Sequence, residues 1–189
     1  TPYYNKPTQR GLIEHFKAIA AEVDLPCIVY NVPGRTACNV LPRTMATLKE
    51  TLPQVVGCKE ATANLTQISE VVEYCGPDFM VLSGDDFTVL PTMAIGGCGV
   101  ISVVSNIVPG LMADMCAAFQ KGDLALAREL HFKSQPLCRA MFIETNPIPV
   151  KTALSMMGRM GPELRLPLVP LEPKNEECLR SVLQSCGLL

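Results

Sequence analysis

Three chemically useful side chains lie in or directly after apolar runs of the kind that form buried strands. Lys59 ends the run Val55-Val56-Gly57-Cys58, Tyr30 lies within Cys27–Val32, and Arg35 follows Tyr30 in a Pro-Gly segment. A lysine amine attacks carbonyl groups when burial disfavours its ammonium form and so lowers its pKa. Lys59 could then form an imine with a keto acid, while Tyr30 transfers protons and Arg35 clamps a carboxylate. These residue types predict an imine-forming site for a keto acid.

Each of these residues also has an ordinary structural interpretation. Lys59 could pack its stem on the rim of a sheet and hold its ammonium in water, and Tyr30 could be a core tyrosine with a hydrogen-bonded hydroxyl. Arg35 could be a solvated charge in a loop. Asp85 and Asp86 follow a further apolar run, and we interpret them as caps of the next helix.

Other common site chemistries lack their motifs. The sequence contains no Gly-x-Gly-x-x-Gly and no Gly-Lys-Ser/Thr, and the Gly96–Gly99 cluster precedes a predicted strand, where no helix N-terminus can meet a phosphate. His15 and His131 fall in predicted helices, away from strand ends, which disfavours a histidine-activated nucleophile. The nine cysteines form no Cys-x-x-Cys pair. We therefore predict no metal site and no disulfide framework, and we expect a reducing, cytoplasmic location.

The elements that would position these residues alternate along the chain. Helical spacing of apolar residues is interrupted by short β-branched runs, which predicts an α/β fold with a parallel sheet. The predicted strands are Cys27–Val32, Val55–Lys59, Phe79–Leu82 and Val100–Val104. The predicted helices are one capped by Thr8 and running to Val23, then Pro42–Leu52, Asn64–Cys75, Val89–Ile95, Val108–Lys121 and Leu124–Phe142, with shorter pieces near Val150–Met157 and Glu176–Cys186, while Pro33–Thr36 is predicted to be a loop.

Ligands of parallel α/β folds bind at the carboxyl ends of the strands. In sequence order these ends supply Tyr30 with Arg35, then Lys59 with Glu60, then Gly84 with Asp85, then residues 101–106. The strand ends therefore bring the candidate chemistry to one edge of the sheet.

Two domains are predicted: residues 1–145 as half of a barrel, and residues 146–189, rich in proline, as a helical extension. Four βα units do not close an eight-stranded barrel, which takes ~250 residues. An isolated half would leave strand edges and an apolar face uncovered. Because the sequence also begins with Thr1 and no methionine, we expect the first half of a (β/α)8 barrel to lie outside it.

The composition indicates a folded protein without an electrostatic partner. Hydrophobic residues make up 48% and charged residues 18%, and the net charge of -2 is spread without a basic run. This excludes the footprint of a nucleic-acid-binding or membrane-surface protein. Every long apolar stretch is interrupted well before the ~20 residues of a membrane span.

Several short motifs together resemble the dihydrodipicolinate synthases, which belong to the pyruvate-dependent class I aldolase and N-acetylneuraminate lyase family. These motifs are Tyr3-Tyr4-Asn5-Lys6-Pro7, Tyr30-Asn31-Val32-Pro33-Gly34-Arg35-Thr36, Gly57-Cys58-Lys59-Glu60-Ala61-Thr62, Ser83-Gly84-Asp85-Asp86, Gly97-Cys98-Gly99-Val100-Ile101-Ser102 and Asn146-Pro147-Ile148-Pro149-Val150-Lys151. The resemblance extends over the whole chain, and Arg35 favours the synthases over the lyases.

The resemblance implies a TIM barrel, here its second half, and a reaction. Lys59 would form a Schiff base with pyruvate, with no separate cofactor, and the enamine would attack aspartate 4-semialdehyde in lysine biosynthesis through diaminopimelate. Tyr30 would relay protons and Arg35 would bind the semialdehyde carboxylate. Tyr4 would reach into the neighbouring subunit of a homodimer or dimer of dimers. The other implied site residues are Tyr3 at that interface, near a lysine-binding site of some members, and Gly84 and Ile101 lining the pyruvate pocket.

Two alternatives remain open at this stage. The chain could be an inactive half-barrel or an assembly partner, because the segments expected to hold the pyruvate carboxylate would lie outside it. It could also belong to another pyruvate-dependent aldolase, such as an N-acetylneuraminate lyase.

Overall fold

The computed structural model describes all 189 residues, which form two compact units. Unit 1 is Thr1–Ile101 and unit 2 is Ser102–Leu189. The domain boundary predicted at 145/146 falls inside unit 2, between two of its helices. That boundary, as a division between a half-barrel and an extension, stays a prediction. No helix in the structure is long and apolar enough to cross a membrane.

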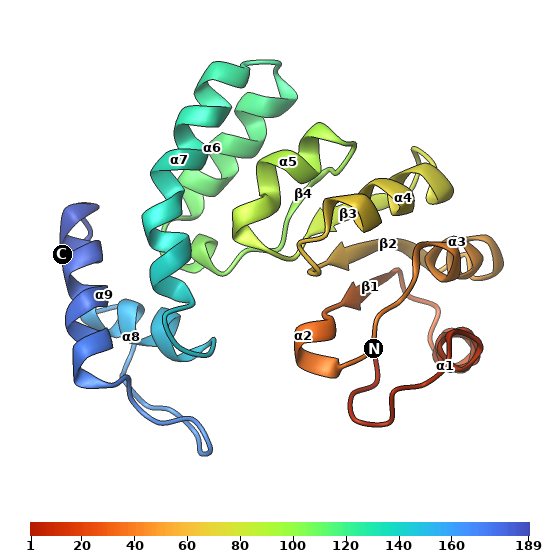
Figure 1. The fold of residues 1–189 in the computed structure, drawn as a ribbon, viewed down its shortest axis with the longest axis horizontal. Helices are drawn as coiled ribbons and strands as arrows, with labels where there is room; N and C mark the ends of the chain where they lie inside the picture. The colour runs from red at the N-terminus through yellow and green to blue at the C-terminus, as the bar shows by residue number, and fades with distance from the viewer. The chain divides into compact units, whose positions relative to one another are not determined.

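Unit 1 is built on a parallel sheet in which each strand pairs with the next one along the chain (Figure 1). The strands are β1 (Cys27–Asn31), β2 (Val55–Glu60), β3 (Met80–Ser83) and β4 (Gly99–Val100). Four successive parallel strands joined by helices are the arrangement of half a (β/α)8 barrel, which confirms the predicted fold class.

The fourth predicted strand, Val100–Val104, was too long. Pairing with β3 covers only Gly99 and Val100, and the 3₁₀ turn η2 (Val104–Asn106) follows. The hydroxyl of Ser102 accepts a hydrogen bond from the Ser105 N–H at 2.8 Å. Such a local side-chain bond offers the backbone an alternative to the strand ladder, so apolar β-branched residues alone did not extend the strand.

Two helices of unit 1, α1 and α4, begin at side-chain caps. Thr8 accepts a hydrogen bond from the Gly11 N–H at the start of α1, and Asn64 accepts one from the Gln67 N–H at the start of α4. Asp85 occupies the N-cap position of η1. The elements are α1 (Gln9–Glu22), α2 (Pro33–Thr36), α3 (Pro42–Thr51), α4 (Leu65–Cys75), η1 (Asp86–Thr88) and α5 (Val89–Ala94).

The segment Pro33–Thr36, predicted to be a loop, forms the short helix α2 instead. Pro33 suits the first helical turn because it has no N–H to satisfy there. Ala37 ends the helix in a left-handed conformation (φ 55°), and its N–H donates to the Pro33 carbonyl at 2.8 Å. The Pro-Gly pair therefore starts a single helical turn, where we had expected it only to end a strand.

The two faces of the sheet differ in burial. Val29, Cys58 and Val81 align on one face and are almost completely buried under α1, α3 and α4. Figure 1 shows these helices on the same side of the strands. The opposite face carries Ile28, Tyr30 and Met80, which are 36–42% exposed. Alternation along parallel strands thus puts the core on one side and the candidate lysine on the other.

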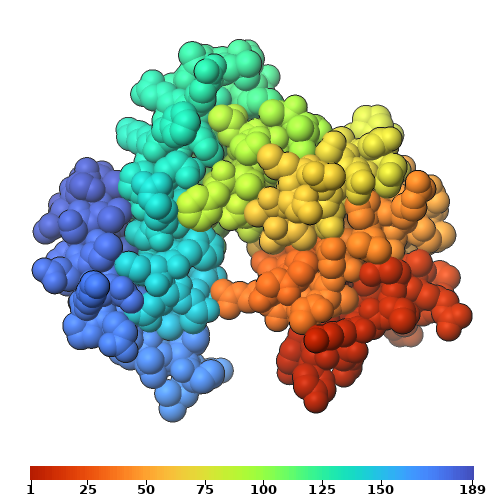
Figure 2. Space-filling model, viewed as in Figure 1, coloured from red at the N-terminus to blue at the C-terminus, as the bar shows by residue number.

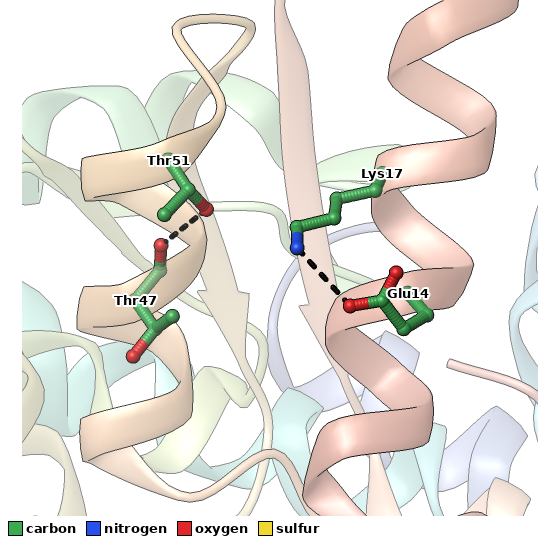
Figure 3. Close-up of polar contacts among 4 residues, drawn as sticks. All are labelled: Glu14, Lys17, Thr47 and Thr51. Atoms are coloured by element: carbon green, nitrogen blue, oxygen red, sulfur yellow. Dashed lines mark hydrogen bonds and ion pairs between the residues drawn. The ribbon is translucent and has the colours of Figure 1, made fainter.

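The outer surfaces of α1 and α3 carry local polar contacts. Figure 3 shows Lys17 Nζ donating to Glu14 at 3.0 Å, and the Thr51 hydroxyl donating to the Thr47 carbonyl at 2.7 Å. Exposed pairs of this kind contribute only ~0.2–1 kcal/mol. The fully buried Leu12 and its neighbours in the core therefore anchor α1 more strongly than its charges do.

Unit 2 is helical and forms a continuous body, coloured from green to blue in Figure 2. Its helices are α6 (Pro109–Gln120), α7 (Leu124–Met141), α8 (Ile148–Met156) and α9 (Pro173–Ser185). Helix α7 packs against α6 and α9, and α8 packs against α9. The buried contacts are made mainly by long apolar side chains, namely Met112, Met115, Leu137, Met141, Leu179 and Leu183.

Candidate active site

Lys59 and Tyr30 form the centre of the site on the open face of the sheet. The two residues are direct partners in the pairing of β1 with β2, so their side chains leave the sheet side by side. Lys59 Nζ lies 4.0 Å from the centroid of the Tyr30 ring. At this distance the ring attracts the ammonium group and holds the amine over its face. Lys59 is half-buried and Tyr30 is 40% exposed, so both remain accessible from this side.

Glycine at position 84 gives the Lys59 stem its space. A Cβ atom at Gly84 would lie 3.1 Å from Lys59 Cγ and 2.6 Å from Ala61 Cβ. The Gly84 N–H donates to the Glu60 carbonyl at 2.7 Å, which brings the end of β3 close to the residue after Lys59. Gly84 therefore lies directly against the candidate nucleophile, and its predicted role in lining a substrate pocket stays a prediction.

Ile101 lies at the end of β4, and its N–H donates to the Ser83 carbonyl at 2.9 Å. Its side chain is 45% exposed. The backbone at Ile101 thus continues the row of strand ends that begins at Tyr30 and passes through Lys59 and Gly84. The structure places these four predicted residues on neighbouring strands or directly after them.

Arg35 lies on α2, directly after β1, and its side chain is exposed. The residue beside it, Thr36, donates its hydroxyl to the carbonyls of Val32 and Cys38 at 3.3 and 3.1 Å. These bonds anchor α2 to the end of β1. Arg35 is therefore held near the strand ends by the local fold.

Tyr3 and Tyr4 are not gathered into the group around Lys59. Their side chains are 74% and 82% exposed, and Tyr4 has a left-handed backbone conformation (φ 70°). The segment nevertheless begins beside α2, where the Thr1 hydroxyl donates to the Thr36 hydroxyl at 3.1 Å. Both tyrosines project from unit 1, so the interface roles implied for them stay predictions.

A buried polar cluster lies on the opposite face, directly behind Lys59 and Tyr30. Glu60 is fully buried, and its carboxylate accepts hydrogen bonds from Asn31 Nδ2 at 2.9 Å, Gln67 Nε2 at 3.2 Å and the Thr62 N–H at 2.9 Å. Asn39 joins the cluster through Asn31 and Gln67. Sequence reasoning placed Glu60 beside Lys59 at a strand end but missed its burial and its partners Asn31, Gln67 and Asn39. The only signal was the position of Glu60, which strand alternation directs to the core side.

Burial also shifts the titration of three groups in unit 1. It raises the pKa of the Cys58 thiol well above its usual range, with the negative charge of Glu60 adding to the effect. It raises the pKa of Cys75 to about 11 and raises that of Asp85, where hydrogen bonds from Thr88 and Phe87 act in the opposite direction. Cys58 lies on the core face of the sheet, on the opposite side from Lys59. Its buried thiol is therefore no candidate nucleophile, although it is adjacent to Lys59 in the sequence.

No group of three or more His, Cys, Asp or Glu side chains in the structure is arranged to hold a metal ion. The groups at the site are an amine, a phenol and, on α2, a guanidinium, presented at the ends of parallel strands. This combination is typical of enzymes that form imines with carbonyl substrates.

Comparison with known proteins agrees with this class. The model of the dihydrodipicolinate synthetase family matches residues 1–186, and the chain belongs to that family. A 4-hydroxy-tetrahydrodipicolinate synthase of Oleidesulfovibrio alaskensis is 67% identical over 189 residues, which are the whole of this chain and 65% of that protein. The chain thus spans slightly less than two-thirds of the length of this relative.

Two solved structures show the same fold over the whole chain. The crystal structure of dihydrodipicolinate synthase from Thermotoga maritima is 52% identical, with a TM-score of 0.97 over 65% of its own length. The chloride-inhibited dihydrodipicolinate synthase of Acinetobacter baumannii, crystallised with pyruvate, is 43% identical, with a TM-score of 0.96 over 65% of its length.

Proposed function

We propose that the protein condenses pyruvate with aspartate 4-semialdehyde, and that this chain supplies the Schiff-base lysine, Lys59. The observation that carries the proposal is the position of Lys59 Nζ over the Tyr30 ring, 4.0 Å from its centroid, at the end of a parallel strand. Membership of the dihydrodipicolinate synthetase family and the name of the Oleidesulfovibrio relative support it. The pyruvate complex of the Acinetobacter protein supports the choice of keto acid.

The first half of the reaction uses Lys59 and Tyr30. The neutral amine attacks the pyruvate carbonyl, the addition product loses water, and the imine forms. Loss of a proton from the pyruvate methyl group then gives the enamine. We assign proton exchange with these intermediates to the Tyr30 hydroxyl, because Tyr30 is the direct cross-strand partner of Lys59. No additional cofactor takes part, because the lysine itself is the electron sink once it carries the imine.

The second half requires recognition of the aldehyde substrate. The enamine carbon attacks the aldehyde of aspartate 4-semialdehyde, and a new carbon–carbon bond forms. Arg35 on α2 is the group we assign to its carboxylate, since a guanidinium binds carboxylates through two parallel hydrogen bonds. Gly84 and Ile101 offer backbone groups on the same edge of the sheet.

The remaining parts of the proposal concern assembly and location. We assign Tyr4 and Tyr3, both strongly exposed, to an interface between two copies of the protein, as a homodimer or a dimer of dimers. The open apolar face of the sheet is assigned to the remaining part of the barrel. The reducing location expected of a biosynthetic enzyme with free thiols is the cytoplasm.

Trapping with borohydride tests the nucleophile. The protein is incubated with pyruvate and sodium borohydride, and its peptides are analysed by mass spectrometry. A reduced pyruvate adduct is expected on Lys59 and on no other lysine. Lys59→Arg should abolish the adduct, while the control Lys49→Arg, on α3, should retain it. An unmodified Lys59 in folded protein would overturn the proposal.

Two further variants separate the roles of the other residues. Tyr30→Phe keeps the ring over the amine but removes the hydroxyl, so trapping should persist at a rate reduced by about 10²–10⁴-fold. Arg35→Ala should leave pyruvate trapping unchanged but raise the KM for aspartate 4-semialdehyde. Cleavage of N-acetylneuraminate in place of condensation would assign the site to the lyases instead.

A further inference from the structure

We propose that Glu60 is a positioning residue, whose buried carboxylate determines the arrangement of Lys59 and Tyr30 through Asn31. This inference rests on the proposed Schiff-base role of Lys59. Glu60 and Asn31 are direct partners in the pairing of β1 with β2, one residue beyond the Tyr30–Lys59 pair and on the opposite face of the sheet. Asn31 Nδ2 donates to Glu60 Oε2 at 2.9 Å, with both residues fully buried.

The polarity of this cluster is determined by the backbone. The Val40 N–H donates to Asn31 Oδ1 at 3.0 Å, and Asn31 Nδ2 donates to the Val40 carbonyl at 3.4 Å. In a reversed Asn31 amide, Nδ2 would face the Val40 N–H, which is also a donor, and Oδ1 would face the Val40 carbonyl, which is also an acceptor. Asn31 must therefore direct its NH₂ at Glu60, and the group that receives it must be an acceptor.

The other bonds to Glu60 impose the same requirement. Oε2 also accepts from Gln67 Nε2, and Oε1 accepts from the Thr62 N–H. Gln67 and Asn39 exchange two amide hydrogen bonds, of 2.9 and 3.0 Å. The carboxylate thus meets three N–H donors and no cation, and an acceptor-only group satisfies all three. A glutamine at this position would direct its own NH₂ at one or more of these donors in either orientation of its amide.

This arrangement links the segments that carry Lys59, Tyr30 and Arg35. Glu60 and Thr62 flank the end of β2 after Lys59, and Asn31 ends β1 after Tyr30. Through Asn39 and Val40, Asn31 also holds the chain that returns from α2, which carries Arg35. Glu60 is therefore placed to control site geometry without touching a substrate, and a misplacement of about 1 Å can cost about 10²-fold in rate.

The test compares Glu60→Gln with wild type by the rate of borohydride trapping of pyruvate on Lys59 at saturating pyruvate. Glutamine has nearly the same shape but must present an NH₂ to at least one of the three donors. We expect a trapping rate lower by about 10- to 100-fold per folded molecule. Ile68→Val, on the same helix as Gln67 and fully buried, is the matched control for a loss of stability alone. It should lower the thermal midpoint and leave the trapping rate unchanged.

A rescue variant makes the test specific. In Asn31→Asp/Glu60→Gln the donor and acceptor exchange places, and the Asn39–Gln67 amide pair can reverse with them. Every bond to residue 60 is then restored, while the 3.4 Å bond to the Val40 carbonyl is replaced by a contact between two acceptor oxygens, and the Val40 N–H keeps its acceptor. We expect the double variant to recover most of the trapping rate, whereas Asn31→Asp alone, which places two carboxylates together, should be slow.

The outcomes separate the two proposals. Absence of any adduct in the wild-type protein would refute the proposed function. A wild-type trapping rate in folded Glu60→Gln, or a double variant no faster than either single variant, would overturn the positioning role. If Glu60→Gln does not fold, Gln67→Met, which removes one donor at similar volume, replaces it. Gln67→Met should then slow trapping more than Ile68→Val at an equal thermal midpoint, and equal trapping rates would overturn the inference.

Discussion

Replacing Gly84 with alanine is expected to disturb Lys59 through direct contact. The new Cβ atom would lie 2.6 Å from Ala61 Cβ and 3.1 Å from Lys59 Cγ. Both distances are below the ~3.5–4.0 Å at which carbon atoms attract each other. Forcing an extra carbon into such a space costs about 1–3 kcal/mol. At roughly 2–4 °C per kcal/mol, the thermal midpoint should fall by about 2–12 °C.

The shortest contact of the new Cβ can be removed separately. Ala61→Gly deletes the Ala61 Cβ, so the double variant Gly84→Ala/Ala61→Gly loses that contact and keeps the two of 3.1 Å, with Lys59 Cγ and Ala61 Cα. Stability, followed by thermal unfolding, should recover in part. The rate of borohydride trapping on Lys59 should stay low, because the Lys59 stem is still displaced.

Gly110→Ala is the control for the loss of glycine itself. A Cβ at Gly110, near the start of α6, meets no atom within 4 Å. Its stability should be unchanged or higher by up to about 1 kcal/mol, because alanine is the better helix former. Full recovery of both stability and trapping in the double variant would refute the argument that Gly84 makes room for Lys59. So would a Gly84→Ala protein that is as stable and as fast as wild type.

Three further predictions follow from burial and capping. Iodoacetamide should modify the exposed Cys98 before the buried Cys58 and Cys75, because burial shields these two thiols and raises their pKa values. The rates are measured by peptide mass spectrometry, and equal rates for the three cysteines would contradict this prediction. Burial lowers the pKa of His131 in the folded protein. The folded state is therefore favoured while the ring is neutral, above the unfolded pKa of about 6.5, and this stability is lost as the pH falls from that value through the lower folded pKa. The drop in thermal midpoint between about pH 8 and pH 5 should be smaller in His131→Gln than in wild type. Asn64→Ala removes the α4 cap and should lower the unfolding free energy in urea by about 1 kcal/mol, whereas no change would mean the cap is not used.

The sequence was sufficient to predict the row of strand ends. Apolar runs before Tyr30, Lys59 and Gly84 imply buried parallel strands, and parallel strands bring their carboxyl ends to one edge. The structure places Tyr30 and Lys59 on the successive strands β1 and β2, and Gly84 directly after β3, as that reasoning requires. The contact between Lys59 and Tyr30 follows once β1 pairs with β2 in the observed register.

The polar cluster could not be predicted in the same way. Strand alternation assigns Glu60 to the core side, but an isolated buried carboxylate is costly, so its partners decide whether it can stay there. Those partners are Asn31 of β1, Gln67 of α4 and the Thr62 N–H, with Asn39, from the segment before α3, bonded to both amides. None has a spacing that points to Glu60. Their meeting depends on packing between elements, which no local pattern in the sequence encodes.

The register of β1 on β2 connects this cluster to the chemistry. The pairing is irregular near its start: Cys27 lies opposite Val55, but the next residue, Ile28, lies opposite Gly57, so Val56 is passed over. Apolar residues alone do not specify the register after such an irregularity. A slip of one residue would carry Lys59 to the side under the helices and Glu60 to the open face. The Asn31–Glu60 bond is satisfied in one register only, and a slipped Lys59 would be a buried cation without a partner. The carboxylate next to the candidate nucleophile therefore selects the register in which Lys59 faces Tyr30.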